Sequence, residues 1–592
     1  MERRNSAITV ALIVTATLAV ASPGSAVVHK NPDLGPNILI FTPAMSRAVM
    51  QEQIDQAYSI ERRSEFGSAR YAFLFLPGEY HLDVPVGFYT QVLGLGTSPD
   101  AVHITGNVHA DASHDNNNAT TTFWRDAEGF SVTPTSGTMQ WAVSQAVPFR
   151  RMHVRGDLVL HQHHGWASGG WMSDTLVDGN VDSGSQQQWI SRNCEWGSWT
   201  GSNWNMVFVG STRLPEGDWP NPPYTKIAQT PVVREKPFLE VDENGKWNVR
   251  VPEFRKNSVG ITWHGGGTPG RTISLEQFYI ARPGDNVAAT INAQLAQGKH
   301  LLLTPGIYDL TEPIRVTRPN TVVLGLGFAT LRPIRGTAAL TTADVDGIEI
   351  AGLLFDAGPE TSPVLLEIGP EANPLQINKA RHSPDHKKDP ITLHDVFFRV
   401  GGAGVGRTQT NLRINSNDVI VDHTWIWRAD HGDGVGWSNK TSKTSNTSAN
   451  GLVVNGDDVT VYGLFVEHHQ QFQVLWNGNG GRTYFYQSEI PYDPPDQRSY
   501  SSAPGTNGWA SYKVADTAAT HEAWGLGIYS VFIEPHVTLS RAIEVPKKPD
   551  IRFHHMITVA LGDNGEISNV IDDNGGPTAI KPRVTPKVAE FP

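Results

Sequence analysis

A long-range repeat constrains the fold of this chain more than any other feature. Residues 74–96 read LFLPGEYHLDVPVGFYTQVLGLG, and residues 301–327 read LLLTPGIYDLTEPIRVTRPNTVVLGLG. Each copy contains an apolar strand, Pro-Gly-x-Tyr, a polar link and Val-Leu-Gly-Leu-Gly, and each follows a helix-like stretch. One structural unit used twice predicts two similar domains in tandem.

A shorter repeat occurs inside the second copy. Residues 346–357, 417–429 and 457–469 each contain an acidic or amide turn, an alternating strand and a second apolar strand. Short strands that recur between Asn, Asp and Gly turns predict a parallel β-helix, in which each coil stacks on the previous one. An array of β-sandwiches is the alternative, and it is disfavoured because tight Asn-Gly or Asp-Gly turns do not join successive strands systematically.

The N-terminus has the pattern of a secretory signal peptide. It begins MERR, continues through an apolar run from Ala7 to Ala21, and then reaches small residues at Gly24 and Ala26. A positive start, a short apolar core and small residues at the cleavage point are typical of exported proteins. We predict cleavage after Ala26, so that residues 1–26 are the signal peptide, with Ala21 as the alternative.

The remaining boundaries follow from the repeats. We predict a first β-helix domain over 27–257, with a hairpin insertion at 234–257 around an Asn-Gly turn, and a second β-helix domain over 286–592. The Gly- and Pro-containing stretch 258–285 is predicted to link the two domains.

Composition restricts the class of protein. Only 18% of the 592 residues are charged, and 57 Gly and 39 Pro favour many short strands. The net charge of -12 and the absence of a basic stripe argue against nucleic acid and anionic membranes as partners. The single cysteine, Cys194, cannot form an intramolecular disulfide and is expected to be a small buried side chain. We therefore expect a secreted, extracellular monomer.

Two glutamates between Tyr484 and Tyr529 are candidates for acid chemistry. Glu489 lies in QSEIPYD and Glu522 lies in HEAWGLG, among aromatic, Gly and Pro residues. A carboxyl group held among aromatic side chains has the surroundings that raise a pKa toward that of a general acid. The alternative is that both glutamates are solvated loop residues.

Several motifs resemble glycoside hydrolase family 55, a family of secreted β-1,3-glucanases built from two parallel β-helices side by side. The motifs are SGSQQQW and SRN (183–193), WNMVFVG (204–210), LHDVFFRVGGAGVG (393–406), RADHGDGVGW (428–437), WNGNGGRTYFYQSEIPYDPP (476–495) and VADTAATHEAWGLGIYS (514–530). The resemblance extends over nearly the whole mature chain. It implies an all-β fold of two tandem right-handed parallel β-helices, similar to pectate lyases.

The resemblance also implies an inverting hydrolysis with Glu522 as the general acid and Glu489 as a second carboxylate of the site. Inversion requires room for a water molecule, which places the two catalytic groups roughly 6.5–9.5 Å apart. In the family, a glutamine and a serine of the first domain hold that water. Gln186 and Gln188 are the candidates for the glutamine. The family pattern has its serine where this chain has Val209, so Ser198 or Ser211 is expected to replace it.

Aromatic and polar residues of the second domain are predicted to bind the sugar. The predicted substrate-binding residues are His431, Asp433, Trp437, Trp476, Tyr492, Trp509, His521 and Trp524. Asp430, His431 and Asp433 could instead form a turn, or act as the clustered aspartates of pectin-cleaving hydrolases. No metal and no cofactor are predicted, because adjacent histidines such as His468 and His469 point to opposite faces of a strand.

The sequence therefore predicts a secreted glycoside hydrolase of the β-1,3-glucosidase type that acts on laminarin-type glucans from a chain end. Its partner would be a polysaccharide or oligosaccharide substrate. The alternatives are a β-helix glycosidase of another linkage specificity, a polysaccharide lyase that uses Ca²⁺ and a basic residue, and a non-catalytic glycan-binding protein.

Overall fold

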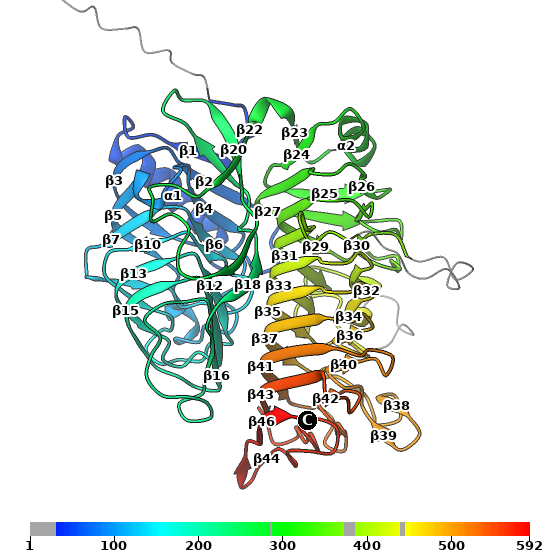
Figure 1. Cartoon of the computed structure of the whole chain (residues 1–592). Helices are drawn as coiled ribbons and strands as arrows, with labels where there is room; N and C mark the ends of the chain where they lie inside the picture. The colour runs from blue at the N-terminus through cyan, green and yellow to red at the C-terminus, as the bar shows by residue number, and fades with distance from the viewer. Residues whose placement is uncertain (1–30, 285–286, 372–384, 438–444) are drawn as a thin grey trace, which may run out of the picture.

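The computed structural model describes residues 31–284, 287–371, 385–437 and 445–592, and the regular secondary structure of these residues is almost entirely β-strand. Two stacks of parallel strands stand side by side in Figure 1, the blue-to-cyan stack formed by the first half of the chain and the green-to-red stack by the second. The predicted signal peptide, residues 1–26, lies outside the described residues. Among the described helices, none has the length and apolar character needed to cross a membrane.

The first β-helix consists of two parallel sheets. Its inner sheet, which faces the other stack, contains β1 (Ile38–Phe41), β2 (Tyr71–Phe75), β4 (Thr90–Gly94), β6 (Arg125–Glu128), β9 (Phe149–Arg150), β12 (Gly170–Ser173), β14 (Gln188–Arg192), β16 (Asn205–Val209) and β17 (Tyr224–Ile227). Its outer sheet contains β3 (Gly78–Pro85), β5 (Val102–His109), β7 (Ser131–Pro134), β8 (Thr138–Gln140), β10 (His153–Val154), β11 (Asp157–Val159), β13 (Leu176–Asp182) and β15 (Glu195–Thr200). Cys194 is fully buried in this domain, as expected.

The second β-helix repeats this arrangement. Its inner sheet contains β23 (Phe278–Ala281), β24 (His300–Leu303), β25 (Ile307–Leu310), β27 (Val322–Pro333), β29 (Glu349–Asp356), β31 (Thr392–Val400), β33 (Ile420–Arg428), β35 (Thr460–Glu467), β37 (Gly481–Glu489), β41 (His521–Ser530), β43 (Ile551–Ala560) and the antiparallel β46 (Lys587–Phe591). Its outer sheet contains β26 (Ile314–Val316), β28 (Leu340–Thr342), β30 (Leu366–Ile368), β32 (Arg407–Ile414), β34 (Thr447–Val454), β36 (Val474–Trp476), β40 (Tyr512–Val514) and β42 (Ile543–Glu544). Two short hairpins, β38–β39 (Ser501–Ala503, Thr506–Asn507) and β44–β45 (Ala579–Ile580, Arg583–Val584), project from its later coils.

The repeated unit predicted from the sequence is present at the start of each stack. Helix α1 (Arg47–Glu61) connects β1 to β2, and helix α2 (Val287–Ala296) connects β23 to β24. The Ser46 side chain caps the first helix by accepting a hydrogen bond from the backbone N–H of Val49. Each helix therefore covers the first coil of its stack, where there is no preceding coil to bury the apolar core.

A small antiparallel sheet lies between the two stacks in the sequence. The predicted hairpin is formed by β19 (Phe238–Val241) and β20 (Trp247–Pro252), and β22 (Gly270–Ser274) extends it. A separate pair is formed by β18 (Thr230–Val233) and β21 (Arg255–Ser258). The predicted linker 258–285 therefore contains two ordered strands, β22 and β23, and the pairing of β23 with β24 starts the second β-helix before residue 286.

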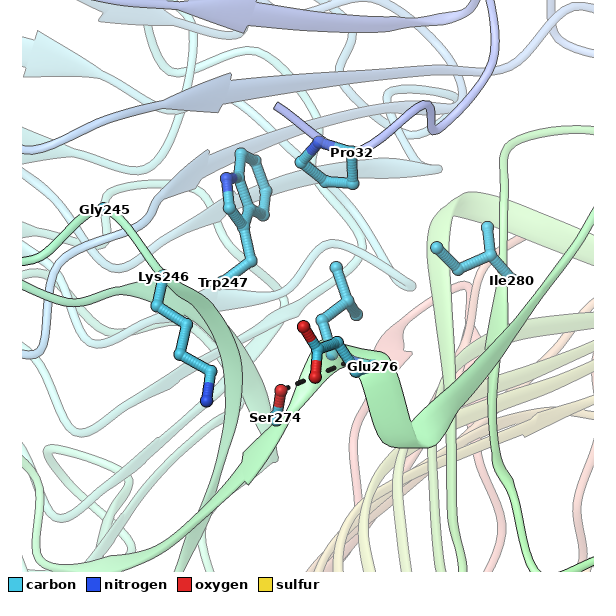
Figure 2. A pocket seen from close by; sticks show the side chains of 8 residues that line it. Pro32, Gly245, Lys246, Trp247, Ser274, Glu276 and Ile280 are labelled. Atoms are coloured by element: carbon cyan, nitrogen blue, oxygen red, sulfur yellow. Dashed lines mark hydrogen bonds between the residues drawn. The ribbon is translucent and has the colours of Figure 1, made fainter. Parts of the chain in front are cut away.

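A cavity of about 250 Å³ lies beside this antiparallel sheet. Figure 2 shows Lys246 and Trp247 from the hairpin, with Ser274 at the end of β22 and Glu276 just after it. The Ser274 hydroxyl accepts a hydrogen bond of 3.4 Å from the Glu276 backbone N–H, so this part of the wall is a capped turn. Glu276 is the only carboxyl group among the residues that line it.

The inner sheets of the two stacks pack face to face, with their strands running in opposite directions. Gln188, at the start of β14, contacts Tyr486 and Tyr529 near the ends of β37 and β41. Arg192, at the end of β14, contacts Asp422 near the start of β33. One continuous cluster of buried side chains includes Trp124 and Phe123 from the first stack and Trp425 from the second. The two β-helices are therefore joined by a packed interface.

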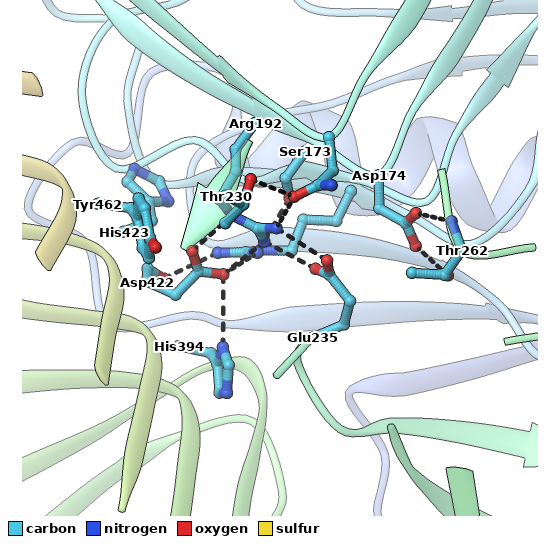
Figure 3. Close-up of polar contacts among 12 residues, drawn as sticks. Ser173, Asp174, Arg192, Thr230, Glu235, Thr262, His394, Asp422, His423 and Tyr462 are labelled. Atoms are coloured by element: carbon cyan, nitrogen blue, oxygen red, sulfur yellow. Dashed lines mark hydrogen bonds and ion pairs between the residues drawn. The ribbon is translucent and has the colours of Figure 1, made fainter. Parts of the chain in front are cut away.

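Buried ion pairs cross this interface. Arg150 binds Asp395 through Nε and Nη2 at 2.8 Å each and binds Asp422 through Nη1 at 2.7 Å. Arg192, which is fully buried, binds both Asp422 and Glu235, as Figure 3 shows. Burial opposes the charge of Asp422, but the two guanidinium groups outweigh it and hold the pKa of this carboxyl below its usual range.

We predict that Asp422→Asn destabilises the protein strongly, because it leaves Arg150 and Arg192 buried with one carboxylate fewer. Removing one partner of a buried pair lowers the free energy of unfolding by about 3–5 kcal/mol. Denaturant titration followed by circular dichroism measures the change. Glu312→Gln is the control, since it breaks a solvent-exposed pair with Arg315 and should cost less than about 1 kcal/mol. Equal effects of the two substitutions would contradict the prediction.

Candidate functional site

A second cavity, of about 280 Å³, opens at one edge of the interface between the stacks. At this edge the C-terminal ends of the second inner sheet meet the N-terminal ends of the first, because the two sheets run in opposite directions. The second stack contributes Trp425, Trp427, Asp430, His431, Glu467 and Glu489, and the first contributes Thr120, Thr121, Gln145, Ser168 and Gln187. Unlike the cavity of Figure 2, this one gathers several carboxyl groups.

The three carboxyl groups come from successive coils of one sheet. Glu467 is the last residue of β35, Glu489 is the last residue of β37, and Asp430 follows β33 by two residues. Neighbouring parallel strands lie about 4.8 Å apart, so equivalent positions on successive coils stack above one another. The register of the coils thus brings Asp430, Glu467 and Glu489 to one wall of the cavity.

Glu467 is a buried carboxyl group with neutral donors. The Trp425 indole N–H donates to Oε2 at 2.9 Å, and Gln145 Nε2 from the first stack donates to Oε1 at 2.8 Å. Burial, with the nearby charge of Asp430, raises the pKa of Glu467 to about 8, against the lowering effect of the hydrogen bonds. Near neutral pH this group therefore holds a proton.

Glu489 is also buried, and its side chain accepts a hydrogen bond from the Tyr492 hydroxyl. Burial raises the pKa of Glu489 well above its usual value, and the neighbouring carboxyl groups of Glu467 and Asp430 raise it further. Asp430 differs from both, because its hydrogen bond to His431 and the nearby imidazoles lower its pKa to about 2 despite burial. The wall thus sets the carboxylate of Asp430 beside two carboxyl groups whose raised pKa values favour their protonated forms.

The opposite wall is a ladder of neutral polar side chains from the first stack. Ala167 and Gln186, on successive coils, form an isolated parallel β-bridge. The Ala167 side chain packs into a buried cluster with Ala112, Ala119 and Ala142. Because neighbouring residues of an extended chain point to opposite faces, Ser168 and Gln187 point the other way, toward the cavity. The Oε1 atom of Gln187 is buried and finds no hydrogen-bond partner among the described residues. Its acceptor capacity is therefore unused among the described residues.

The structure does not bring Glu522 and Glu489 together. In the pairing of β37 with β41, Glu522 lies beside Arg482, and Tyr529 lies beside Glu489. Arg482 precedes Glu489 by seven residues along β37, and each residue of a strand adds a rise of about 3.3 Å. The resulting distance between Glu522 and Glu489 exceeds the spacing of an inverting pair, even with the left-handed backbone of Phe485 (φ 74°). Glu522 instead accepts a hydrogen bond of 2.7 Å from the Trp524 indole N–H. The predicted pairing of Glu522 with Glu489 is therefore corrected.

The residues predicted to position water also lie outside the cavity lining. Gln186 donates to the carbonyl groups of Val143 and Leu160 and accepts from the Gly169 N–H, so its side chain bonds only to backbone. Gln188 accepts from the Tyr529 hydroxyl at 2.6 Å and joins the two stacks. Ser198 lies on the exposed outer strand β15, where it donates to Asn180. Sequence reasoning chose residues one position away from Gln187, which does line the cavity.

Two of the predicted substrate-binding residues, His431 and Tyr492, line the cavity. The other six lie elsewhere: Asp433, Trp437, Trp476, Trp509, His521 and Trp524. Trp476 and His521 are buried inside the second stack, where their rings contact each other at 4.7 Å. Trp524 stacks on His554 with ring centroids 3.7 Å apart. Their aromatic character serves packing at these positions.

Sequence reasoning missed Glu467, Gln145, Ser168 and Gln187 as site residues. A signal for Glu467 existed, because a lone glutamate ends the apolar strand sequence GLFVE, as Glu489 ends its own strand. No local signal marks Gln145, which reaches a residue 322 positions away. Within the described ranges, no group of three or more His, Cys, Asp or Glu side chains could hold a metal ion.

Comparisons with known proteins agree with the motifs. Residues 278–489 match the family description "LAM55 pectate lyase-like domain". An exo-beta-1,3-glucanase of Streptomyces sp. (strain SirexAA-E / ActE) is 45% identical over 564 residues, which covers 95% of this chain and 90% of the relative.

Solved structures of sacteLam55A from Streptomyces sp. SirexAA-E superpose on the fold with a TM-score of 0.90 and 44% identity, over 95% of this chain and 99% of that one. A glutamate-to-alanine variant of sacteLam55A in complex with glucose matches equally well. On the identity and coverage of these relatives, the chain belongs to glycoside hydrolase family 55.

Proposed function

We propose that the protein is a secreted, exo-acting β-1,3-glucanase that hydrolyses laminarin-type glucans with inversion. The observation that carries the proposal is the buried, proton-retaining carboxyl group of Glu489 in a cavity shared by both β-helices. The named activity of the Streptomyces relative supports the substrate class. Secretion is supported by the signal-peptide pattern of residues 1–26.

In this proposal Glu489 is the general acid. A glycosidic oxygen leaves poorly as an alkoxide, so a protonated carboxyl group within hydrogen-bond reach must supply its proton. Burial, together with the neighbouring carboxyl groups, raises the pKa of Glu489 well above its usual value and so favours the acid form. The Tyr492 hydroxyl donates to the same carboxyl group and orients it. Glu467, on the adjacent coil, exchanges protons with Glu489 and maintains it in the acid form.

The attacking water would bind at the opposite wall. An inverting enzyme activates water on the far side of the sugar ring from the acid. Gln145, Ser168 and Gln187 line that wall from the first β-helix, and their neutral polar side chains are the candidates to hold the water. This division of roles between the stacks replaces the roles predicted for Glu522, Gln186, Gln188 and Ser198. The described residues that line the cavity include no Lys or Arg to act as the basic residue of a polysaccharide lyase, which disfavours that alternative.

Two exposed apolar side chains belong to segments that adjoin the cavity lining. Trp166 and Ile533 are the most exposed large hydrophobic residues of the described chain, at 63% and 68%. Trp166 precedes Ser168 by two residues and so shares its face of the coil, and the Ile533 N–H donates to the carbonyl of Tyr492. A flat apolar indole at the mouth suits the face of a glucose unit that extends outward from the cleaved bond.

We predict that Glu489→Gln lowers kcat on laminarihexaose by about 10²–10⁴-fold, since glutamine cannot donate the proton. Glu522→Gln should retain most of the activity, because Glu522 lies outside the cavity. Glucose release measures both variants, and an aryl β-glucoside with an acidic leaving group should partly rescue Glu489→Gln. A large loss in Glu522→Gln with an active Glu489→Gln would instead return the acid role to Glu522.

The pH–rate profile should have an alkaline limb at unusually high pH for a glutamate. A raised pKa means that the acid form persists at neutral pH and is lost only as the pH rises through that raised value. The pair titrates together, with Glu467 at about 8, so kcat should fall above neutral pH rather than near pH 4–5. Residual activity assayed at pH 6 after incubation at each pH excludes denaturation. An alkaline limb with its midpoint below pH 5 would contradict the raised pKa of these two glutamates.

Trp166→Ala should reduce kcat/KM for laminarihexaose about tenfold, a loss of roughly 1.4 kcal/mol, with little change for laminaribiose. The short substrate does not extend to the mouth of the cavity, so it does not need the indole. Val49→Ala, on α1, is the control for removal of an exposed apolar side chain. Equal loss on both substrates would show that Trp166 acts on folding or on the cavity itself.

A further inference from the structure

A chain of ion pairs connects the first β-helix to the ionised wall of the cavity. Glu65, which follows α1, accepts a hydrogen bond of 2.6 Å at Oε1 from His431 Nε2. His431 Nδ1 lies 3.0 Å from Oδ1 of Asp430, and the two residues line the cavity. Both ring nitrogens of His431 thus face carboxylates, which requires the doubly protonated, cationic imidazolium.

The segment that carries Glu65 fits into a notch of the second β-helix. The Phe66 ring stacks on Trp427 with centroids 6.2 Å apart and meets the edge of His431 at 5.6 Å. A Cβ atom at Gly402 would lie 2.3 Å from the Phe66 ring, and one at Gly432 would lie 2.7 Å from it. Glycine is required at both positions, because any side chain would push Phe66 and Glu65 away from the wall.

Asp430 stays ionised in surroundings that favour its neutral form. Burial acts to raise the pKa of Asp430. The hydrogen bond from His431 and the electrostatic interactions with His468 and His431 outweigh burial and lower this pKa to about 2. Burial acts to lower the pKa of His431, and its hydrogen bonds to Asp430 and Glu65 raise it to about 10. The other titratable groups that face this cluster are Glu467, Glu489, His468, and the Arg428–Asp493 pair behind His468.

We propose that Glu65 and His431 are positioning residues that clamp Asp430 in the cavity wall as a carboxylate. The clamp rests on the proposed function and adds a role for a residue of the first β-helix that lies outside the cavity lining. The His431 cation keeps Asp430 ionised, and the negative charge on Asp430 raises the pKa of Glu467 and Glu489, which favours their protonated forms. Asp430 then presents a permanent hydrogen-bond acceptor to a hydroxyl group of the sugar.

The test compares Glu65→Gln and His431→Asn with the parent enzyme, with kcat/KM for laminarihexaose measured from pH 4 to 8. Loss of the donor and of the cation raises the pKa of Asp430, so Asp430 takes up a proton as the pH falls. We expect kcat/KM of His431→Asn to fall at least tenfold between pH 7 and pH 5, where the parent changes little. The pH profile of kcat/KM for Glu65→Gln should shift in the same direction by a smaller amount. The profile of the double variant should match that of His431→Asn.

Matched controls are Glu79→Gln and His81→Asn on the outer strand β3, whose side chains are exposed. A uniform loss of kcat/KM at every pH, or an unchanged pH profile, would overturn the clamp, because a purely structural role would not change the pH dependence of kcat/KM. Melting temperatures identify misfolding, and Glu65→Gln preserves side-chain shape if His431→Asn does not fold.

Glucose binding measured by calorimetry over the same pH range reports the same shift without turnover. A parent enzyme that binds glucose but releases none from β-1,3-oligosaccharides would contradict the proposed function and leave the clamp to be judged by binding. Binding that is independent of pH in His431→Asn would contradict the clamp alone.

Discussion

The face-to-face packing of the two inner sheets determines where everything else in this molecule lies. Charged residues from both stacks meet inside that interface, and Arg150 and Arg192 are satisfied only when Asp395 and Asp422 of the other stack are in place. Desolvating so many charges is costly, and a small shift of one stack would leave some of them unpaired. The ion pairs therefore select one relative position of the stacks. The same relative position sets the width of the cavity and the reach of Gln145 to Glu467.

The cavity owes its chemistry to an uneven distribution of cations around three stacked carboxyl groups. Glu467 and Glu489 are surrounded by neutral donors, so burial dominates and both retain protons. Asp430 alone has an imidazolium beside it, held from the other side by Glu65. Three carboxyl groups on neighbouring coils would otherwise compete for the same protons. The sequence position of one histidine separates their roles.

The sequence predicted the architecture well because coils are local structures. The repeat at 74–96 and 301–327 predicts both stacks and a helix at the start of each, and the motif QSEIPYD, among aromatic, Gly and Pro residues, identifies Glu489. Glu522 was favoured because it has aromatic neighbours in the sequence. Its distance from Glu489 depends on the register of β37 and β41, which no local pattern reveals. The neutral wall was missed for a related reason, because Gln187 and Gln186 are alike in sequence and differ only in the face to which they point.

The position of the cavity along the interface between the two stacks determines where a protein of this fold can gain or lose coils. A β-helix grows by adding coils at its ends, and each coil contacts only its neighbours. The cavity uses coils away from the helix-covered ends, from Thr120 to Gln187 in the first stack and from Trp425 to Leu561 in the later part of the second. Coils could therefore be gained or lost at the helix-covered ends of both stacks while the reacting groups keep their spacing. Insertion of even one residue within the central strands would instead turn the carboxyl groups to the opposite face.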